Sequence, residues 1–333
     1  MIEHATSFTI GVLVFPGCLR SSAVTPLDVF QIANTVASYR PAGGGVEFRG
    51  QWVSARGEDS ATVGGLTFQL QPLAGAALDA LMVPGVAHRT SDDLAQSLAV
   101  LGPEQEAVRA FAASGRPLAS SCSGTCLLAR AGLLDGRRAT TSWWLGPYFR
   151  EQFPRVILDA EELLMLDGGI VSSGGVTSCL DLALWLVGHF GGEELRQLTA
   201  KILIIDSNRS SQAPYVAAAM MEAEGHAVIE RARRWLNGRL DGPWTMAELA
   251  EHCHTTQRTL LRRFQDAMSL SPVQYAQQLR VERAKVLLES TRLSLDAITH
   301  RCGYADVSTF SKVFKRWAQL TPRDYRVRFG LRQ

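Results

Sequence analysis

The segment Ser120-Ser121-Cys122-Ser123-Gly124-Thr125 places a thiol among small residues, where a strand pattern passes directly into a helical one. A thiol in such a turn lies beside backbone N–H groups and the positive end of a helix dipole, which favour the thiolate. This is the arrangement of a nucleophile elbow, whose chemistry is covalent catalysis. A cysteine that simply packs in a tight turn gives the same pattern, so this second interpretation stays open.

Covalent catalysis by a thiol also needs a proton acceptor or a stabilised thiolate. No His is adjacent to Cys122, and for the distant His88 a surface or capping role is the simpler interpretation. A redox pair with Cys126 is a third interpretation. It is the weakest, because two cysteines one helical turn apart cannot close a disulfide without local unfolding.

Two predicted helices near the C-terminus leave polar and basic side chains on an open face, and these are the side-chain types that read base edges in the major groove. The first helix contributes Gln257, Arg258 and Arg262, and the second contributes Ser308, Thr309, Lys312 and Lys315. Further arginines are better suited to phosphates, which set register without reading sequence. They are Arg263, Arg280, Arg283 and Arg316. Exposed arginines that are merely solvated are the alternative.

A duplication explains how these helices are positioned. Phe264, Pro272 and Tyr275 recur fifty residues on as Phe314, Pro322 and Tyr325, and Cys253 recurs as Cys302 at a shift of forty-nine. The segments 245–275 and 294–325 each predict two helices joined by a short turn, followed by a helix that begins at a proline. Two helix-turn-helix units on one chain indicate a DNA-binding domain with two recognition helices.

Capping residues mark where these helices begin. Thr245 with Glu248 forms a capping-box pattern, Thr256 and Ser294 are expected N-caps, and either Asp306 or Ser308 starts the last recognition helix. Leu260, Leu261 and Phe264 are expected to face inward in the first unit, as are Phe310, Val313 and Phe314 in the second. Gly303 allows the tight turn. A long helix over 272–289 would hold the two recognition helices roughly 34 Å apart, one turn of duplex.

Charge separates the chain into two parts. Residues 231–333 carry 19 Lys and Arg against 9 Asp and Glu, a net charge of +10, whereas residues 1–230 carry 15 against 23, a net charge of −8. A basic last third fits a polyanion-binding module. The longest apolar runs are too short to span a bilayer, and Met1–Thr9 lacks the pattern of a signal peptide. Six scattered cysteines predict free thiols in a reducing cytosol and no metal site.

Strand and helix patterns alternate in the first two-thirds, which predicts a parallel sheet covered on both faces. The expected strands are 8–15, 50–54, 80–83 and 117–121. The expected helices are 28–37, 92–98, 103–113, 125–131, 143–153, 176–190 and 193–204. One more helix is expected over 223–240, which Asp241-Gly242-Pro243 then breaks.

The residues 244–328 resemble the DNA-binding domain of the AraC/XylS family. The motifs that carry this resemblance are Arg258-Thr259-Leu260, Arg263-Phe264, Ser271-Pro272, Arg283-Ala284, Gly303-Tyr304, Phe310, Phe314-Lys315, Thr321-Pro322 and Tyr325-Arg326. One departure occurs twice, since Ser269 and Gln319 stand where that family usually has Gly. A side chain there must tolerate a left-handed turn at a cost on the order of 1 kcal/mol.

Residues 8–205 resemble the class I glutamine amidotransferase-like fold in its ThiJ/PfpI branch. The motifs are Val14-Phe15-Pro16-Gly17, residues 26–30, Val83-Pro84-Gly85, the Cys122 elbow, residues 131–136, residues 139–141, Ser173-Gly174-Gly175 and residues 181–184. In active members the elbow cysteine works with a His and often with an acidic residue. Ser142 and Ser22 stand at these helper positions here, so the resemblance implies a degenerate site without catalytic residues.

These resemblances imply an α/β flavodoxin-like sandwich as N-terminal domain and an all-α tandem helix-turn-helix domain at the C-terminus. We expect a ligand-sensing domain over 1–208, a linker with a helix over 209–243 and a DNA-binding domain over 244–333. The cleft at the degenerate Cys122 site is expected to hold a small polar metabolite, with the amides of Gly85 and Ser123 as hydrogen-bond donors. Its expected lining is Thr25, Gly85, Cys122, Ser123, Trp143, Gly175, Val176 and Thr177.

The function that these resemblances imply is cytoplasmic, sequence-specific transcriptional regulation, with activation in response to an amino acid or a quaternary amine. The expected partners are promoter DNA, a small-molecule effector, a second copy of the chain and RNA polymerase. Neither a cofactor nor a membrane is expected. The alternative is a cysteine-dependent amidase or glyoxalase-like enzyme that uses Cys122.

Overall fold

The computed structural model describes residues 6–39, 45–206, 209–216, 227–268 and 270–330. The chain divides into two compact units, Met1–Gln212 and Ala213–Gln333. Each unit has hydrophobic cores of its own, one in the first unit and two in the second. Within the described ranges, no helix is both long and apolar enough to cross a membrane.

The first unit is built on a seven-stranded sheet in the order β10-β11-β7-β6-β1-β2-β5. The strands are β1 (Thr6–Leu13), β2 (Val46–Ser54), β5 (Gln71–Pro72), β6 (Ala80–Val83), β7 (Leu118–Ser121), β10 (Leu164–Asp167) and β11 (Ile170–Ser173). All neighbours pair in parallel except β10, which runs antiparallel to β11 at the edge. The predicted parallel sheet is therefore a mixed one. The central strands β6 and β7 are buried along their whole length, as parallel strands covered on both faces must be.

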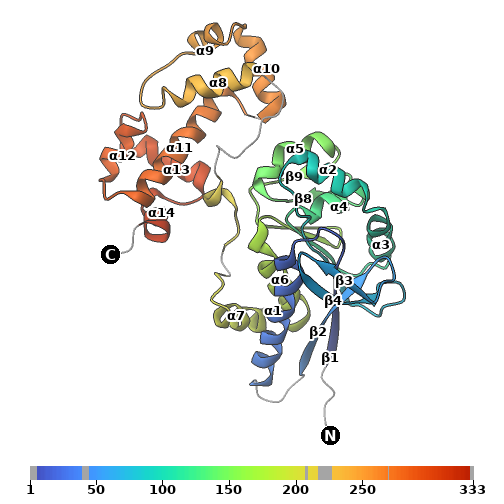
Figure 1. Ribbon diagram of the computed structural model, residues 1–333. Helices are drawn as coiled ribbons and strands as arrows, with labels where there is room; N and C mark the ends of the chain where they lie inside the picture. The colour runs from blue at the N-terminus through green and yellow to red at the C-terminus, as the bar shows by residue number, and fades with distance from the viewer. Residues whose placement is uncertain (1–5, 40–44, 207–208, 217–226, 269, 331–333) are drawn as a thin grey trace. The chain divides into compact units, whose positions relative to one another are not determined.

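Helices cover both faces of this sheet (Figure 1). On one side α1 (Arg20–Ser38), α6 (Cys179–Gly191) and α7 (Glu193–Ile202) pack together. On the other side lie α2 (Ser91–Ala99), α3 (Gly102–Ala112), α4 (Gly124–Arg130) and α5 (Gly146–Gln152). The sequence predicted the first helix, α1, only over 28–37. The helix begins eight residues earlier and keeps Pro26 buried inside.

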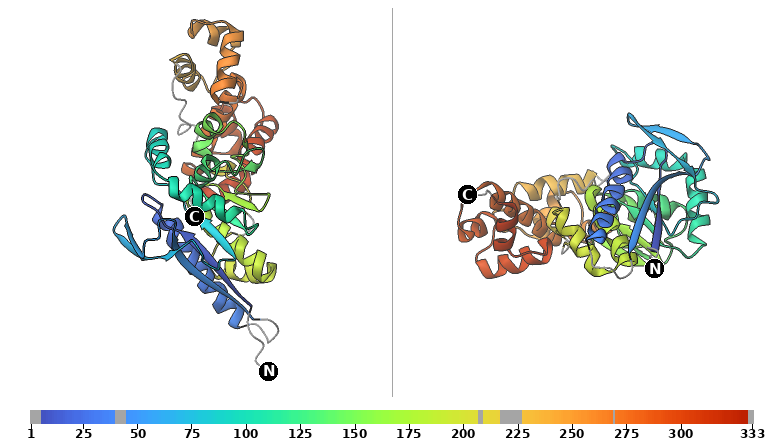
Figure 2. Two further views of the ribbon diagram at one scale, coloured as in Figure 1. Left: turned by 90° about the vertical axis from the view of Figure 1, so that its right-hand side faces the viewer. Right: turned by 90° about the horizontal axis from the view of Figure 1, so that it is seen from below.

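Smaller elements complete the first unit. The strands β3 (Ser60–Val63) and β4 (Leu66–Gln69) form a hairpin, and β8 (Arg138–Ala139) pairs with β9 (Ile157–Leu158). Short 3-10 turns are η1 (Trp143–Leu145) and η2 (Val176–Ser178). Figure 2 shows the β3–β4 hairpin standing out from the sheet. None of these short strands was predicted from the sequence.

The second unit is helical. It contains the turn η3 (Ala213–Tyr215) and α8 (Ala227–Asn237), α9 (Met246–His252), α10 (Gln257–Met268), α11 (Pro272–Ser290), α12 (Leu295–Arg301), α13 (Val307–Ala318) and α14 (Pro322–Phe329). The predicted helix over 223–240 corresponds to α8, and its residues 223–226 lie outside the described ranges. The long α11 is shared by two cores. Tyr275 and Leu279 belong to the core of the first repeat, and Ala284 and Leu288 belong to that of the second.

Candidate functional site

The elbow at Cys122 keeps the backbone geometry of a nucleophile elbow. Cys122 follows β7 directly and has a φ of 56°, a left-handed conformation that a residue with a side chain adopts only when its surroundings hold it there. Its N–H donates to the Ser173 carbonyl at 2.8 Å, and the Thr141 hydroxyl donates to its carbonyl at 2.8 Å. Gly124 lets α4 approach β6, since a Cβ there would lie 2.4 Å from the Pro84 carbonyl oxygen.

The thiol in this elbow is sealed from solvent. Cys122 is 1% exposed, and its Sγ lies 2.8 Å from the Ser142 hydroxyl. Burial raises the pKa of the Cys122 thiol, while hydrogen bonds from Ser142 and Ser123 lower it in part. Among the described residues, its hydrogen-bond partners include neither an imidazole nor a carboxylate. The thiol is therefore protonated at neutral pH, and none of its hydrogen-bond partners in the described part of the chain can act as a base.

The helper positions have taken on structural roles. The Ser22 hydroxyl accepts from the Gly85 N–H at 3.2 Å, so this amide is not the available donor that the sequence suggested. Ser142 accepts from the Gly175 N–H at 3.2 Å. His88 lies nearby, and its Nδ1 donates to the Val86 carbonyl at 2.8 Å, a local bond that fits a structural role.

The residues expected to line the ligand pocket fall into two groups. Gly85, Cys122, Ser123, Trp143 and Gly175 lie around the elbow: a Cβ on Gly85 would lie 3.3 Å from both the Cys122 Cβ and the Ser123 Oγ. The other group lies toward solvent. Thr25 is half-buried with its hydroxyl 3.9 Å from the Cys179 Sγ, Thr177 is exposed, and Val176 is 40% exposed.

Gln212 is a residue of this site that sequence reasoning missed. Its side chain is 3% exposed, and its Nε2 lies 2.8 Å from the Thr141 carbonyl and 3.0 Å from those of Ala160 and Glu162. Its Oε1 accepts from the Trp143 N–H at 3.2 Å. The amide therefore holds the segment that carries Ser142. No signal in the sequence indicated this role, because residue 212 falls within the expected linker 209–243 and its hydrogen-bond partners lie 50 or more positions away.

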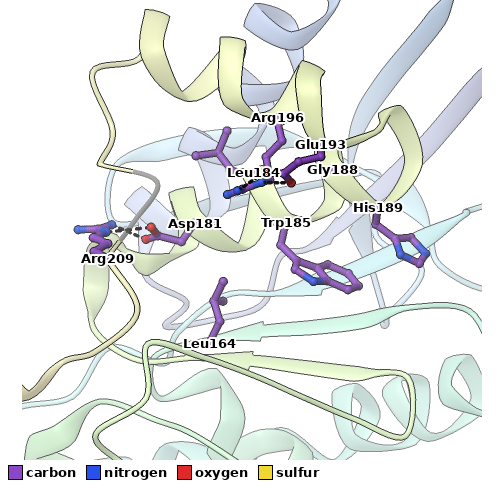
Figure 3. Close-up of a pocket in the computed structure, with 9 residues that line it drawn as sticks. All are labelled: Leu164, Asp181, Leu184, Trp185, Gly188, His189, Glu193, Arg196 and Arg209. Atoms are coloured by element: carbon purple, nitrogen blue, oxygen red, sulfur yellow. Dashed lines mark hydrogen bonds and ion pairs between the residues drawn. The ribbon is translucent and has the colours of Figure 1, made fainter.

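One hollow in the first unit was not expected from the sequence. It has a volume of about 380 Å³ and lies between β10, α6 and α7 (Figure 3). Its lining is Leu164, Asp181, Leu184, Trp185, Gly188, His189, Glu193, Arg196 and Arg209. Arg209 pairs with Asp181, and Arg196 pairs with Glu193, so its charges are already matched within the protein.

In the second unit, local capping follows the sequence. Thr245 and Glu248 form the capping box of α9, Thr256 accepts from the Thr259 N–H at 3.2 Å, and Ser294 caps α12. Of the two candidates for the start of α13, Asp306 is the N-cap, since its side chain accepts from the Thr309 N–H at 2.7 Å. This bond also lowers the pKa of the Asp306 carboxyl.

The predicted base-reading side chains are all exposed, some on the first turns of α10 and α13 and others one or two turns further along. They are Gln257, Arg258, Arg262, Ser308, Thr309, Lys312 and Lys315. Arg263 is half-buried and Arg283 is exposed on α11. The inward position expected for Leu261 is wrong, because its side chain is 44% exposed while Leu260 and Phe264 are fully buried. Leu261 thus lies on the open face beside Arg262.

Arg280 has an internal role that the sequence did not show. Its Nε donates to the Leu240 carbonyl at 2.9 Å, its Nη2 donates to the Gly242 carbonyl at 2.8 Å, and its guanidinium lies over the Tyr304 ring. Arg280 thus joins the segment 240–242, which precedes α9, to Tyr304 in the turn between α12 and α13. Because its guanidinium is held by these internal partners, Arg280 is not among the phosphate contacts that we propose.

Left-handed residues mark equivalent turns of the two repeats. His254, with a φ of 49°, follows Cys253 just as Gly303, with a φ of 74°, follows Cys302. Gln319 adopts a φ of 54° after α13, so it tolerates the left-handed turn where AraC-type domains usually have Gly. Its counterpart Ser269 lies outside the described residues.

Comparison with known proteins agrees with this division. The family model "DJ-1/PfpI family" matches residues 9–188, and "Helix-turn-helix domain" matches residues 249–328. The HTH-type transcriptional regulator GbdR of Pseudomonas aeruginosa is 31% identical over 220 residues, 66% of this chain and 60% of that protein. The match therefore spans about three-fifths of that relative's length.

Two further relatives match one unit each. The HTH-type transcriptional activator RhaR of Yersinia pseudotuberculosis is 40% identical over 85 residues, 25% of this chain and 29% of that protein. A solved structure from Vibrio parahaemolyticus has a TM-score of 0.50 at 20% identity, covers 60% of this chain and 100% of its own, and shows the fold of the first unit. The chain belongs to the DJ-1/PfpI family and joins that domain to a C-terminal AraC-type helix-turn-helix domain.

Proposed function

We propose that this chain is a sequence-specific DNA-binding regulator of transcription. The observation that carries this proposal is the pair of repeat-related helices α10 and α13, each of which exposes polar and basic side chains. Such side chains are what a recognition helix presents to the major groove. The surrounding residues 231–333 carry a net charge of +10, which suits a phosphate backbone.

The base-reading positions in this proposal are Gln257, Arg258 and Arg262 on α10, with Ser308, Thr309, Lys312 and Lys315 on α13. Arg263 and Arg283 are proposed phosphate contacts. The 19-residue α11 between the units has a length of about 28 Å at 1.5 Å per residue. This length is compatible with two recognition helices that enter adjacent turns of the major groove.

The first unit is proposed to hold a small polar effector of the amino acid or quaternary amine type. The effector would enter beside Thr25, Val176 and Thr177, and contact Trp143 and the Ser142–Gly175 pair at depth. The remaining proposed lining is Gly85, Cys122 and Ser123. We propose activation as the sign of regulation, as for the transcriptional activator RhaR, and cytoplasmic action as a dimer with RNA polymerase as a further partner.

An enzyme based on Cys122 is the alternative, since the strained elbow is kept. It is the weaker proposal because the thiol is 1% exposed, has a raised pKa and is hydrogen-bonded, among the described residues, to serines and not to a base. Turnover of an amide or a dicarbonyl that is lost in Cys122→Ala would establish it.

Selection of duplexes from a random pool by the full-length protein tests the DNA-binding proposal. We expect a recurrent motif with two half-sites about one helical turn apart, and an affinity that falls steeply between 50 and 200 mM salt. Recovery of no motif, or an affinity indifferent to salt, would contradict it. A thermal-shift screen of amino acids and carboxylated quaternary amines tests the effector, because a ligand bound only by the folded state raises the melting temperature.

A further inference from the structure

The segment Arg209–Val216, which we call the connector, is anchored at both ends. Its first half belongs to the first unit. The Ser210 carbonyl accepts from the Leu163 N–H at 2.8 Å, the Gln212 N–H donates to the Glu161 carbonyl at 2.7 Å, and Arg209 donates to Asp181. Figure 3 shows this last pair beside α6. The connector is thus fixed to the sensor domain by backbone and side chain alike.

The Gln212 side chain links the connector to the residues around the Cys122 elbow. Its amide donates to the carbonyls of Thr141 and Glu162 and accepts from the Trp143 N–H. Thr141 and Trp143 flank Ser142 in the chain. Ser142 in turn contacts the Cys122 thiol and the Gly175 N–H. Gly174 has no side chain where the amide lies, since a Cβ there would be 1.9 Å from the Gln212 Nε2. A change at Ser142 therefore reaches Gln212 through one backbone segment.

The second half of the connector belongs to the second unit. Lys285 of α11 is 4% exposed, and its ammonium donates to the carbonyls of Ala213 at 3.3 Å and Val216 at 3.0 Å. The same ammonium pairs with the Glu282 carboxylate at 2.7 Å, and the two carbonyls accept the further hydrogen bonds that a buried charge needs. The Tyr215 hydroxyl accepts from Arg328 at 3.0 Å, and its ring contacts that of Phe329. The turn η3 also lies against α13.

We infer that the connector transmits the state of the elbow site to the second helix-turn-helix, with Gln212 as the residue that senses the site. This inference rests on the proposed function. Gln212 and Ala213 share a peptide bond, so a shift of one anchored half must move or strain the other. A ligand that binds Ser142 or the Gly175 N–H alters the hydrogen bonds of Gln212. The contacts of the connector with Lys285, with Arg328 and Phe329, and with α13 then change as well. Its two states are an engaged and a released Gln212 amide.

Hydrogen exchange of the full-length chain, read by mass spectrometry, tests this coupling without DNA or effector. In Gln212→Ala, residues 140–143 and 209–212 should exchange about fivefold faster, the effect of about 1 kcal/mol of lost hydrogen bonding. The coupling predicts that α13 and α14 also exchange at least twofold faster. Gln105→Ala is the matched control, since Gln105 also donates to a backbone carbonyl of the first unit, that of Leu98 at 2.9 Å. Its effect should stay within that unit.

Tyr215→Ala tests the coupling from the other side, and it also serves if Gln212→Ala does not fold. Tyr215 is 42% exposed, so its removal should be tolerated. Because coupling is reciprocal, exchange at residues 140–143 should rise in this variant. If the changes in exchange rate stop at the boundary between residues 212 and 213 in every folded variant, the inference is overturned. Failure of the wild-type chain to select DNA would overturn the proposed function instead, and would leave this measurement unaffected.

Discussion

Replacement of Gly303 with alanine should destabilise the second unit, whereas the equivalent change His254→Ala in the first repeat should not. Gly303 has a φ of 74°, and a Cβ there would lie 2.3 Å from the Leu240 carbonyl oxygen and 3.1 Å from the Arg280 guanidinium. His254 holds the same place in its repeat with a φ of 49° and already carries a Cβ. The pair therefore compares an added Cβ with one that is already accommodated.

The magnitude follows from two terms. A residue with a side chain in the left-handed region costs about 1–2 kcal/mol, and the smaller backbone entropy of unfolded alanine offsets about 0.5–1 kcal/mol of this. The Leu240 carbonyl must also move, and it accepts a hydrogen bond from the charged Arg280, a bond worth about 1.5–3 kcal/mol. We expect a total loss of about 2–4 kcal/mol for Gly303→Ala and less than about 0.5 kcal/mol for His254→Ala.

Hydrogen exchange of peptides from α11 and α12 in the full-length chain measures both variants, because it reports the opening free energy of this region separately from that of the first unit. Exchange in Gly303→Ala should be faster by a factor of about 30 to 800, the range that 2–4 kcal/mol implies. Equal effects of the two substitutions would refute the reasoning, as would wild-type exchange rates in Gly303→Ala.

Three further results are expected. Gln319→Gly should stabilise the second unit by about 0.5–1 kcal/mol in chemical denaturation, because glycine adopts the φ of 54° without strain, and a loss of stability would contradict this. Burial raises the pKa of four thiols in the first unit, that of Cys179 to about 11; the others are Cys18, Cys122 and Cys126. The stability that these protonated thiols contribute should therefore be complete below about pH 8.5 and decline toward pH 11. A melting temperature of the first unit that rises over this pH range would contradict this. Cys122 should resist iodoacetamide at pH 8 until the first unit unfolds, and rapid modification of the native protein would show an accessible thiolate.

Local chemistry accounts for the features that the sequence predicted well. The N-caps Thr245, Thr256 and Ser294 each bond within three residues of themselves, and the elbow at Cys122 is a continuous strand-turn-helix motif. Such features depend on near neighbours, so the residue order is enough to place them.

Features that depend on distant partners escaped prediction. Gln212 bonds to residues 50–71 positions away, and Arg280 bonds to carbonyls 38–40 positions away. Leu261 was misplaced because Leu260 and Leu261 both lie a helical turn from Phe264, and only the packing of α10 decides which one is buried. The edge strand β10 is four residues long and has no alternating pattern, so periodicity could not identify it.

The central claim is that α10 and α13 read DNA, and the affinities of Arg258→Ala and Lys312→Ala for a selected duplex and for its scrambled counterpart test it most directly. Each substitution should lower the discrimination between the two duplexes by about 1–3 kcal/mol. The control Arg155→Ala removes the same charge as Arg258→Ala from a side chain that is 79% exposed in the first unit, and should change neither affinity. Discrimination that stays at the wild-type value in both variants would contradict the claim.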